Sequence, residues 1–101
     1  MAKTNMIERE KRRAKIVKKY AAKRLQLKEL IRSPKTNPEV RADAQAKLQK
    51  QPRDASPSRG RHRCAITGRS RGVYRRFGLA RVKVREAVAR GELPGVSKAS
   101  W

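Results

Sequence analysis

The chain has 101 residues and carries 29 Lys and Arg against 8 Asp and Glu, a formal net charge of +21 at pH 7. Only 37% of the residues are hydrophobic and 4% are aromatic, which excludes a large core. Self-repulsion of this size opposes compaction unless a polyanion neutralises it, and neutralised phosphates release condensed counterions. We therefore expect a nucleic-acid partner, incomplete folding in its absence, and an affinity that falls steeply with added salt.

Cysteine content and hydropathy bear on the compartment. The single Cys64 cannot form an intramolecular disulfide, and no apolar run of signal-peptide length follows Met1. No stretch approaches the roughly 20 apolar residues that cross a bilayer. We expect a cytoplasmic protein that does not span a membrane.

Charge is unevenly distributed along the chain. Residues 1–32 hold twelve basic and three acidic residues, residues 33–58 hold five and three, and residues 59–101 hold twelve and two. The N-terminal part is rich in lysine, whereas the C-terminal part holds ten arginines and two lysines. Because guanidinium groups bind phosphate in a fixed fork and ammonium groups do not, the C-terminal part is expected to make the more defined contacts.

The first predicted element is a helix from about Met6 to Ile31. Asn5 and Glu8 have the spacing of an N-cap and its capping-box partner. A thin apolar stripe follows at helical spacing, formed by Ile16, Tyr20, Leu27 and Ile31. The first half of the helix lacks such a stripe and is expected to need an external partner.

A second helix is predicted from Pro38 to Lys50. Pro34 ends the first helix by disfavouring helical geometry in Ser33, and Asn37 provides a cap before Pro38. Its apolar stripe is Val40, Ala44 and Leu48, which we expect to lie antiparallel to the end of the first helix.

The remaining chain contains shorter predicted elements. Residues 51–63 combine proline, serine and glycine without periodicity and are expected to be a linker that orders on binding. Residues 64–77 are expected to form turns and short extended pieces. A last helix is predicted over residues 79–90, with Val84, Ala87 and Val88 at helical spacing and Gly91 as its stop, followed by an irregular tail.

The segment from Arg59 to Arg85 is typical of an RNA-binding surface. It contains nine arginines, one lysine and no acidic residue. Tyr74 and Phe77 offer flat faces to unpaired bases, although both could instead be small-core residues. With the basic residues of the first helix and the tail, the expected RNA contacts are Lys11, Arg12, Arg13, Lys15, Lys18, Lys19, Arg59, Arg61, Arg63, Arg69, Arg71, Tyr74, Arg75, Arg76, Phe77, Arg81, Lys83, Arg85, Lys98 and Trp101.

Three stretches carry a specific resemblance: residues 71–79 (RGVYRRFGL), Arg85-Glu86, and residues 91–101 (GELPGVSKASW). In these, and in length and layout, the chain resembles the S-fourteen family of bacterial small-subunit ribosomal proteins, in its long form. The resemblance implies a structural protein without catalysis that binds small-subunit rRNA in the head and supports 3′-domain assembly and the shape of the decoding region. It also implies contacts with small-subunit proteins three, ten and nineteen, and no homo-oligomer.

The implied fold is mainly α and extended. It consists of a helical hairpin arm at residues 1–51, a linker at 52–63, and a small zinc-ribbon-like module at 64–101 that lacks zinc ligands. Many members of the family carry a zinc knuckle of four cysteines, whose matching positions here are Cys64, Thr67, Ala80 and Lys83. Thr, Ala and an ammonium group cannot ligate zinc, and adding His62 does not complete a site.

Something must replace the metal in so small a module. The expected replacement is a packed cluster supplemented by RNA, formed by Ile66, Val73, Phe77, Leu79 and Val82. Lys83 is expected to turn outward to phosphate or to hydrogen-bond across the former site. No cofactor is expected.

Three other functions stay open on the residues alone. The basic helix could lie on a membrane surface, although its apolar face is thin. The charge could serve general nucleic-acid compaction. Cys64 among arginines could be a reactive thiol, but no second cysteine or placed base accompanies it.

Overall fold

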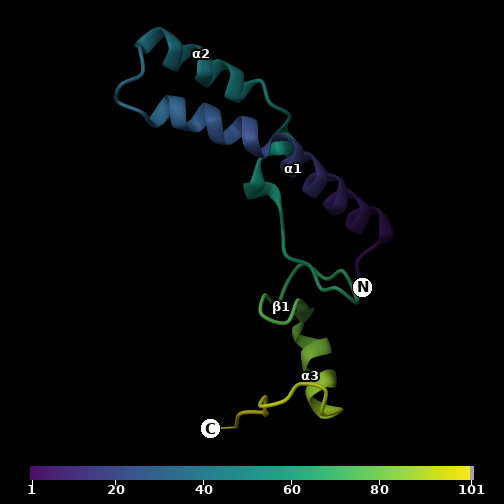
Figure 1. Ribbon diagram of the computed structural model, residues 1–101. Helices are drawn as coiled ribbons and strands as arrows, with labels where there is room; N and C mark the ends of the chain where they lie inside the picture. Colours follow the sequence, from purple (N-terminus) through teal and green to yellow (C-terminus); the bar gives the residue numbers. More distant parts are fainter. Residues whose placement is uncertain (101) are drawn as a thin grey trace. The chain divides into compact units, whose positions relative to one another are not determined.

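The computed structural model describes residues 1–100, and its regular structure is mainly helical, as predicted (Figure 1). Two compact units are present: residues 8–60, the hairpin unit, and residues 1–7 with residues 61–100, the module. The predicted division of the chain at residues 52–63 stays a prediction. No helix in the described part of the chain is both long and apolar enough to cross a membrane. The elements are α1 (Thr4–Arg32), α2 (Pro38–Gln49), the 3₁₀ turns η1 (Arg53–Ala55) and η2 (Pro57–Arg59), β1 (Val73–Tyr74), β2 (Leu79–Ala80) and α3 (Arg81–Ala89).

Helix α1 begins two residues earlier than predicted. The Lys3 carbonyl accepts the first helical hydrogen bonds, from the N–H groups of Met6 at 3.0 Å and Ile7 at 3.3 Å. Asn5 therefore lies inside the first turn, and the predicted capping box of Asn5 and Glu8 is wrong. The start is fixed from outside the helix, because the preceding Ala2 is held by tertiary contacts described below.

Helices α1 and α2 lie side by side and antiparallel within the hairpin unit (Figure 1). Ala44 is 3% exposed on the α2 face that meets α1, and Leu27 and Ile31 of α1 are half-buried. The Arg41 guanidinium donates to the Ser33 carbonyl at 2.9 Å, which satisfies a carbonyl just beyond the end of α1. The predicted hairpin is thus confirmed.

The predicted stripe on α2 needs one correction. Val40 is 47% exposed, whereas Arg41, Ala44 and Leu48 are buried or half-buried. At 100° per residue the centre of this face lies between the directions of Ala44 and Leu48, which leaves Val40 at its edge. Asn37 precedes α2 as expected, but its side chain makes no capping hydrogen bond.

The segment predicted as a linker contains the two 3₁₀ turns. Ala55 in η1 is 1% exposed. Asp54 pairs with Arg59 at 2.8 Å and with Arg13 of α1 at 3.4 Å. Local periodicity could not predict that this segment is structured, because its structure depends on one buried methyl group and one shared carboxylate.

The module is built on a two-stranded antiparallel hairpin followed at once by α3. Val73 pairs with Ala80 and Tyr74 with Leu79. The predicted helix over residues 79–90 therefore begins only at Arg81, because Leu79 and Ala80 belong to the ladder. Its C-terminus is a Schellman motif, in which the N–H groups of Gly91 and Glu92 donate to the carbonyls of Val88 and Ala87, both at 3.0 Å.

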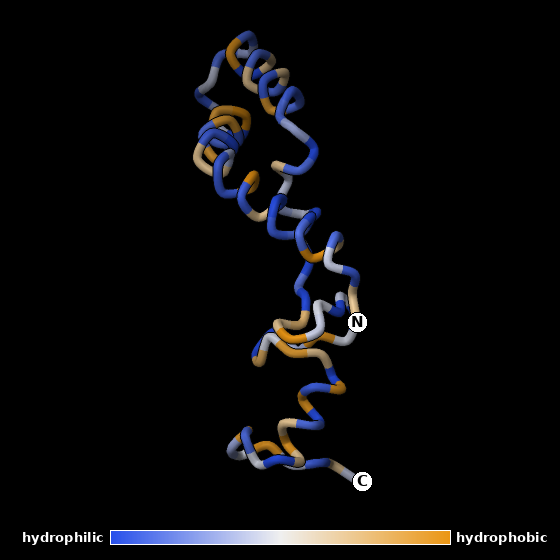
Figure 2. Tube along the Cα trace, turned by 90° about the vertical axis from the view of Figure 1, so that its right-hand side faces the viewer, coloured by the Kyte–Doolittle hydropathy of each residue, from blue (hydrophilic) through white to orange (hydrophobic). Residues whose placement is uncertain are grey.

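The core of the module is small and differs in part from the predicted cluster. Its buried residues include Cys64, Ala80, Val84 and Ala87, of which Val84 and Ala87 follow the predicted helical spacing. Val73, Phe77 and Leu79 are half-buried, but Ile66 is 60% and Val82 is 48% exposed, so their predicted packing is wrong. Val82 lies on the face of α3 opposite Val84. Figure 2 shows how short the hydrophobic stretches of the module are.

Candidate nucleic-acid interface

Five of the six predicted contacts on α1 form one basic face. At 100° per residue, Lys11, Arg12, Lys15, Lys18 and Lys19 fall within an arc of about 120°. All five are exposed. The sixth, Arg13, lies on the other side of the helix, in the arc that contains Ile16 and Tyr20. Helical geometry therefore separates a continuous basic stripe from the side that packs inward.

Several basic residues of the hairpin unit are engaged by carboxylates. Arg13 contacts Glu10 at 3.3 Å and Asp54 at 3.4 Å, and Arg59 contacts Asp54 at 2.8 Å. Lys11 pairs with Glu8 at 2.9 Å, and this hydrogen bond and charge lower the pKa of the Glu8 carboxyl. Arg13 and Arg59 therefore stabilise the hairpin unit in addition to any contact with RNA.

The turn between β1 and β2 presents two arginines beside an aromatic pair. Arg75 and Arg76 are exposed, and the Tyr74 and Phe77 rings meet edge to face with centroids 6.2 Å apart. The Arg76 guanidinium lies 5.9 Å from the Phe77 ring centroid. Phe77 is half-buried, whereas Tyr74 is 52% exposed and offers a flat, accessible face. Phe77 is thus placed to pack within the module, whereas stacking of Tyr74 on RNA stays a prediction.

Arginine side chains hold the loop at residues 68–71. Arg63 donates to the Gly68 carbonyl at 3.0 Å, Arg61 Nε to the Ser70 carbonyl at 3.1 Å, and Arg69 Nε to the Arg71 carbonyl at 3.1 Å. The Cys64 N–H donates to the remaining carbonyl, that of Arg69, at 2.9 Å. Every carbonyl in this stretch has a donor, and three of the four donors are guanidinium groups.

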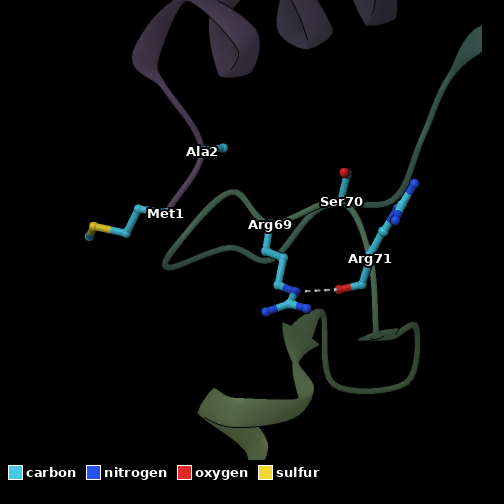
Figure 3. A pocket seen from close by; sticks show the side chains of 5 residues that line it. All are labelled: Met1, Ala2, Arg69, Ser70 and Arg71. Atoms are coloured by element: carbon cyan, nitrogen blue, oxygen red, sulfur yellow. Dashed lines mark hydrogen bonds between the residues drawn. The ribbon is translucent and has the colours of Figure 1, made fainter.

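A shallow hollow of about 330 Å³ lies beside this loop and is lined by Met1, Ala2, Arg69, Ser70 and Arg71 (Figure 3). The figure shows the Arg69 and Arg71 side chains extending to different sides of the loop, with the Arg69 Nε hydrogen bond between them. The residues that line it include two arginines and one serine, and none of them is acidic. Its chemistry therefore suits an anion.

Residues 1–7 complete this region, which the sequence did not indicate. The Ala2 N–H donates to the Thr67 carbonyl at 3.1 Å. Gly68 has φ +73°, and a Cβ added there would stand 2.7 Å from Ile7 Cδ1, so the two residues are in close contact. The available signal was Ile7 itself, an apolar residue at the start of a helix that offers it no apolar neighbours.

Cys64 comes directly before the turn at residues 65–67, its carbonyl accepts a hydrogen bond from the Gly68 N–H at 2.9 Å, and the residue is 3% exposed. Burial raises the pKa of its thiol, but hydrogen bonds from the Thr67 hydroxyl and from the N–H groups of Thr67, Ala80 and Ile66 outweigh this and lower the pKa to about 6. The Thr67 N–H lies 3.5 Å from the sulfur. The sulfur thus sits among N–H donors, an arrangement that stabilises a thiolate.

The residues at the four knuckle positions do not fit zinc. Cys64 offers one sulfur, Thr67 donates toward that sulfur, and Ala80 has only a methyl group. The Lys83 ammonium pairs with Glu86 at 2.9 Å, and its side chain is 29% exposed. In the described part of the chain, no group of three or more His, Cys, Asp or Glu residues is placed to hold a metal ion.

The other predicted contacts are accessible or lie outside the described residues. Arg81, Arg85 and Lys98 are exposed, and His62 is exposed in the loop before Cys64. The predicted contact at Trp101 lies outside the described residues. The module therefore carries exposed positive side chains on its loop, on its strand turn and on α3.

Comparison with known proteins identifies the family of the chain. Residues 47–100 match the family model described as Ribosomal protein S14p/S29e. The chain is 56% identical to the small ribosomal subunit protein uS14 of Alkalilimnicola ehrlichii over 101 residues, which is the full length of both chains. This family is one of ribosomal proteins and not of enzymes. The chain belongs to the S14p/S29e family of ribosomal proteins, as a protein of the small subunit.

Proposed function

We propose that the protein binds small-subunit rRNA in the head, supports assembly of the rRNA 3′ domain, and helps to maintain the decoding and A-site region. It performs no catalysis of its own. Its neighbours in the subunit are small-subunit proteins three, ten and nineteen. The proposal narrows the family's ribosomal role to one RNA region and one mechanism.

The charge of the module is the observation that carries the proposal. Residues 1–7 and 61–100 contain two acidic side chains, Glu86 and Glu92, and these pair with Lys83 and Arg90. The arginines of the strand turn, the loop and α3 therefore have no side-chain carboxylate of the module left to neutralise them. Phosphates supply the missing charge, and the exposed Tyr74 ring supplies a surface for a base or sugar.

The mechanism follows from this charge. Lysines on the α1 stripe reduce repulsion between adjacent RNA segments without fixed geometry, whereas arginines on the module bind phosphates in defined directions. Contacts to several RNA segments at once fix helices that would otherwise separate. The protein thus acts as a counterion and a spacer in one chain.

We further propose that the module is a zinc-ribbon-like fold without its metal. The tight turn at Cys64, the hairpin and the start of α3 keep the four knuckle positions in place. Packing of Ala80 and Val84, the arginine-to-carbonyl hydrogen bonds and the docked residues 1–7 take over the stabilising role of zinc. RNA adds to this stability by mass action.

Binding of the full chain to a 3′-domain rRNA fragment tests the proposal. At moderate salt we expect affinity for the fragment to exceed that for duplex DNA of equal length by at least tenfold, with a strongly negative salt slope. Replacing Arg75 and Arg76 by Gln should weaken RNA binding and reduce the salt slope by about two. Equal affinity for DNA and rRNA would instead support general nucleic-acid compaction.

A membrane-surface role makes a different prediction for the same chain. The apolar stripe of α1 is half-buried in the hairpin unit at Ile16, Tyr20, Leu27 and Ile31, so little apolar surface is left on this helix for a lipid surface. Two results together would contradict our proposal: the protein binds anionic vesicles, and the arginine substitutions leave its affinity for rRNA unchanged.

A further inference from the structure

The hollow beside residues 68–71 differs from the rest of the basic surface because two segments distant in the sequence, residues 1–2 and residues 69–71, line it together. Arg69 and Arg71 contribute the charge, Ser70 contributes a hydroxyl group, and Ala2 closes one side. A lysine on an exposed helix can follow a phosphate, but a hollow of about 330 Å³ has a fixed position on the loop. The hollow would therefore hold a phosphate at one defined position along an RNA chain.

The loop is fixed before any ligand arrives. Arg61 and Arg63 each donate to one of its carbonyls, and neither of these arginines lines the hollow. The Ala2 N–H and the Ile7 side chain hold the preceding turn at Thr67 and Gly68. Carbonyl dipoles, which would repel an anion, are turned toward guanidinium groups. The loop therefore needs little reorganisation to bind an anion.

The charges around the hollow are of one sign. The two acidic side chains of the module pair with Lys83 and Arg90 and do not line the hollow. Arg69 uses its Nε for the Arg71 carbonyl, a bond that orients its guanidinium. The Arg71 side chain extends to the other side of the loop, and its guanidinium group has five N–H donors that suit a phosphate.

We propose that this hollow is a preformed subsite for one backbone phosphate of the RNA, with Ser70 and Arg71 as its contacts and Arg61, Arg63 and Arg69 as positioning residues that hold its loop. The inference rests on the proposed rRNA binding and adds to it a defined location. The shared ligand chemistry is a phosphate group, whether from a phosphodiester or from free inorganic phosphate.

The test compares two substitutions that remove one positive charge each from the module of the full chain. Arg71→Gln should weaken binding to the 3′-domain rRNA fragment about tenfold and reduce the salt slope by about one. Arg90→Gln is the matched control, because Arg90 already pairs with Glu92 and lies away from the hollow. It should change affinity less than twofold.

Ser70→Asp provides a second, independent variant, because the Ser70 contact that holds the loop is made by its backbone carbonyl. An added carboxylate in the hollow should weaken binding more than Arg71→Gln does, with the thermal unfolding midpoint unchanged. If Arg71→Gln and Ser70→Asp both bind like Arg90→Gln, the subsite is refuted. If the unmodified chain shows no preference for the rRNA fragment over duplex DNA, the proposed function is refuted instead.

Neutral methylphosphonate substitution of single RNA phosphates identifies the ligand. Substitution at one RNA position should weaken binding to the unmodified protein. The same substitution should have no further effect on binding to Ser70→Asp, as expected for a coupled pair. If inorganic phosphate competes with RNA equally well for the unmodified protein and for Ser70→Asp, the assignment to a backbone phosphate is overturned.

Discussion

The hairpin unit and the module are both basic but are held together by different interactions. The hairpin unit relies on long helices, two buried methyl groups at Ala44 and Ala55, and carboxylate pairs such as Asp54 with Arg59. The module has two-residue strands and a nine-residue helix, and all five glycines with φ between +62° and +74° lie in it. Its loop carbonyls are satisfied by arginine side chains. Basic residues thus serve mainly as charge in one unit and also as structure in the other.

The largest expected effect is at Gly68. Alanine there combines a φ of +73°, which residues with a Cβ rarely adopt, with a Cβ 2.7 Å from Ile7 Cδ1. We expect a loss of about 3 kcal/mol in the stability of the module, from strain and overpacking together. Native-state amide hydrogen exchange should show faster exchange across the module and unchanged protection in α2.

Gly78→Ala is the matched control for this substitution. Gly78 also has positive φ, +66°, but nothing lies within 4 Å of an added Cβ. Alanine should therefore cost only about 1 kcal/mol. Equal losses at the two glycines would mean that residues 1–7 do not stabilise the module.

The next effect concerns the hairpin unit. Ala44→Leu inserts three heavy atoms where the side chain is 3% exposed against α1, and overpacking should cost about 2 kcal/mol. Helix unfolding followed by circular dichroism should shift to lower temperature. Ala42→Leu, at an exposed position of α2, should leave the midpoint within a degree or two. A midpoint equally lowered by both would contradict the packing of Ala44 against α1.

These two units also differ in how far the sequence predicts them. Helical spacing predicted α1, α2 and the hairpin, because those features depend on residues close in the chain. It also put Val84 and Ala87 on one face of the last helix, and both are buried, although the predicted core cluster did not include them. It failed at Asn5, where docking of Ala2 starts the helix early, and at Ile66 and Val82, where short strands and turns decide which side chain faces inward.

The candidate site divides in the same way. The arginines and Tyr74 were predicted from residue type, because phosphate and base recognition need those groups. The hydrogen bonds of Arg61 and Arg63 to loop carbonyls could not be predicted, since they join residues through tertiary geometry that leaves no periodic signal. Residue type likewise did not select Ser70, whose proposed role follows from its position in the hollow.

A smaller effect is expected when arginine is replaced by lysine in the loop. Arg63→Lys retains the charge but loses the planar group that donates to the Gly68 carbonyl at 3.0 Å. We expect a loss of about 1 kcal/mol in module stability and an unchanged salt slope for RNA binding. Arg75→Lys, on the exposed strand turn, should leave stability unchanged. If both variants are equally stable, the arginines of the loop act as charge alone, and the contrast between the two units disappears.

The smallest effect tests the turn around Cys64. Because its pKa is lowered to about 6 in the folded module, the thiolate stabilises the fold at pH values above the ordinary thiol pKa, and this contribution is lost as pH falls through about 6. Ultraviolet absorbance of the thiolate should titrate with a midpoint near this value. Thr67→Val removes the hydroxyl donor and should move the midpoint upward while the N–H donors remain. A midpoint near the ordinary value of about 8.5 in the unmodified protein would mean that the N–H groups of Thr67 and Ala80 do not face the sulfur.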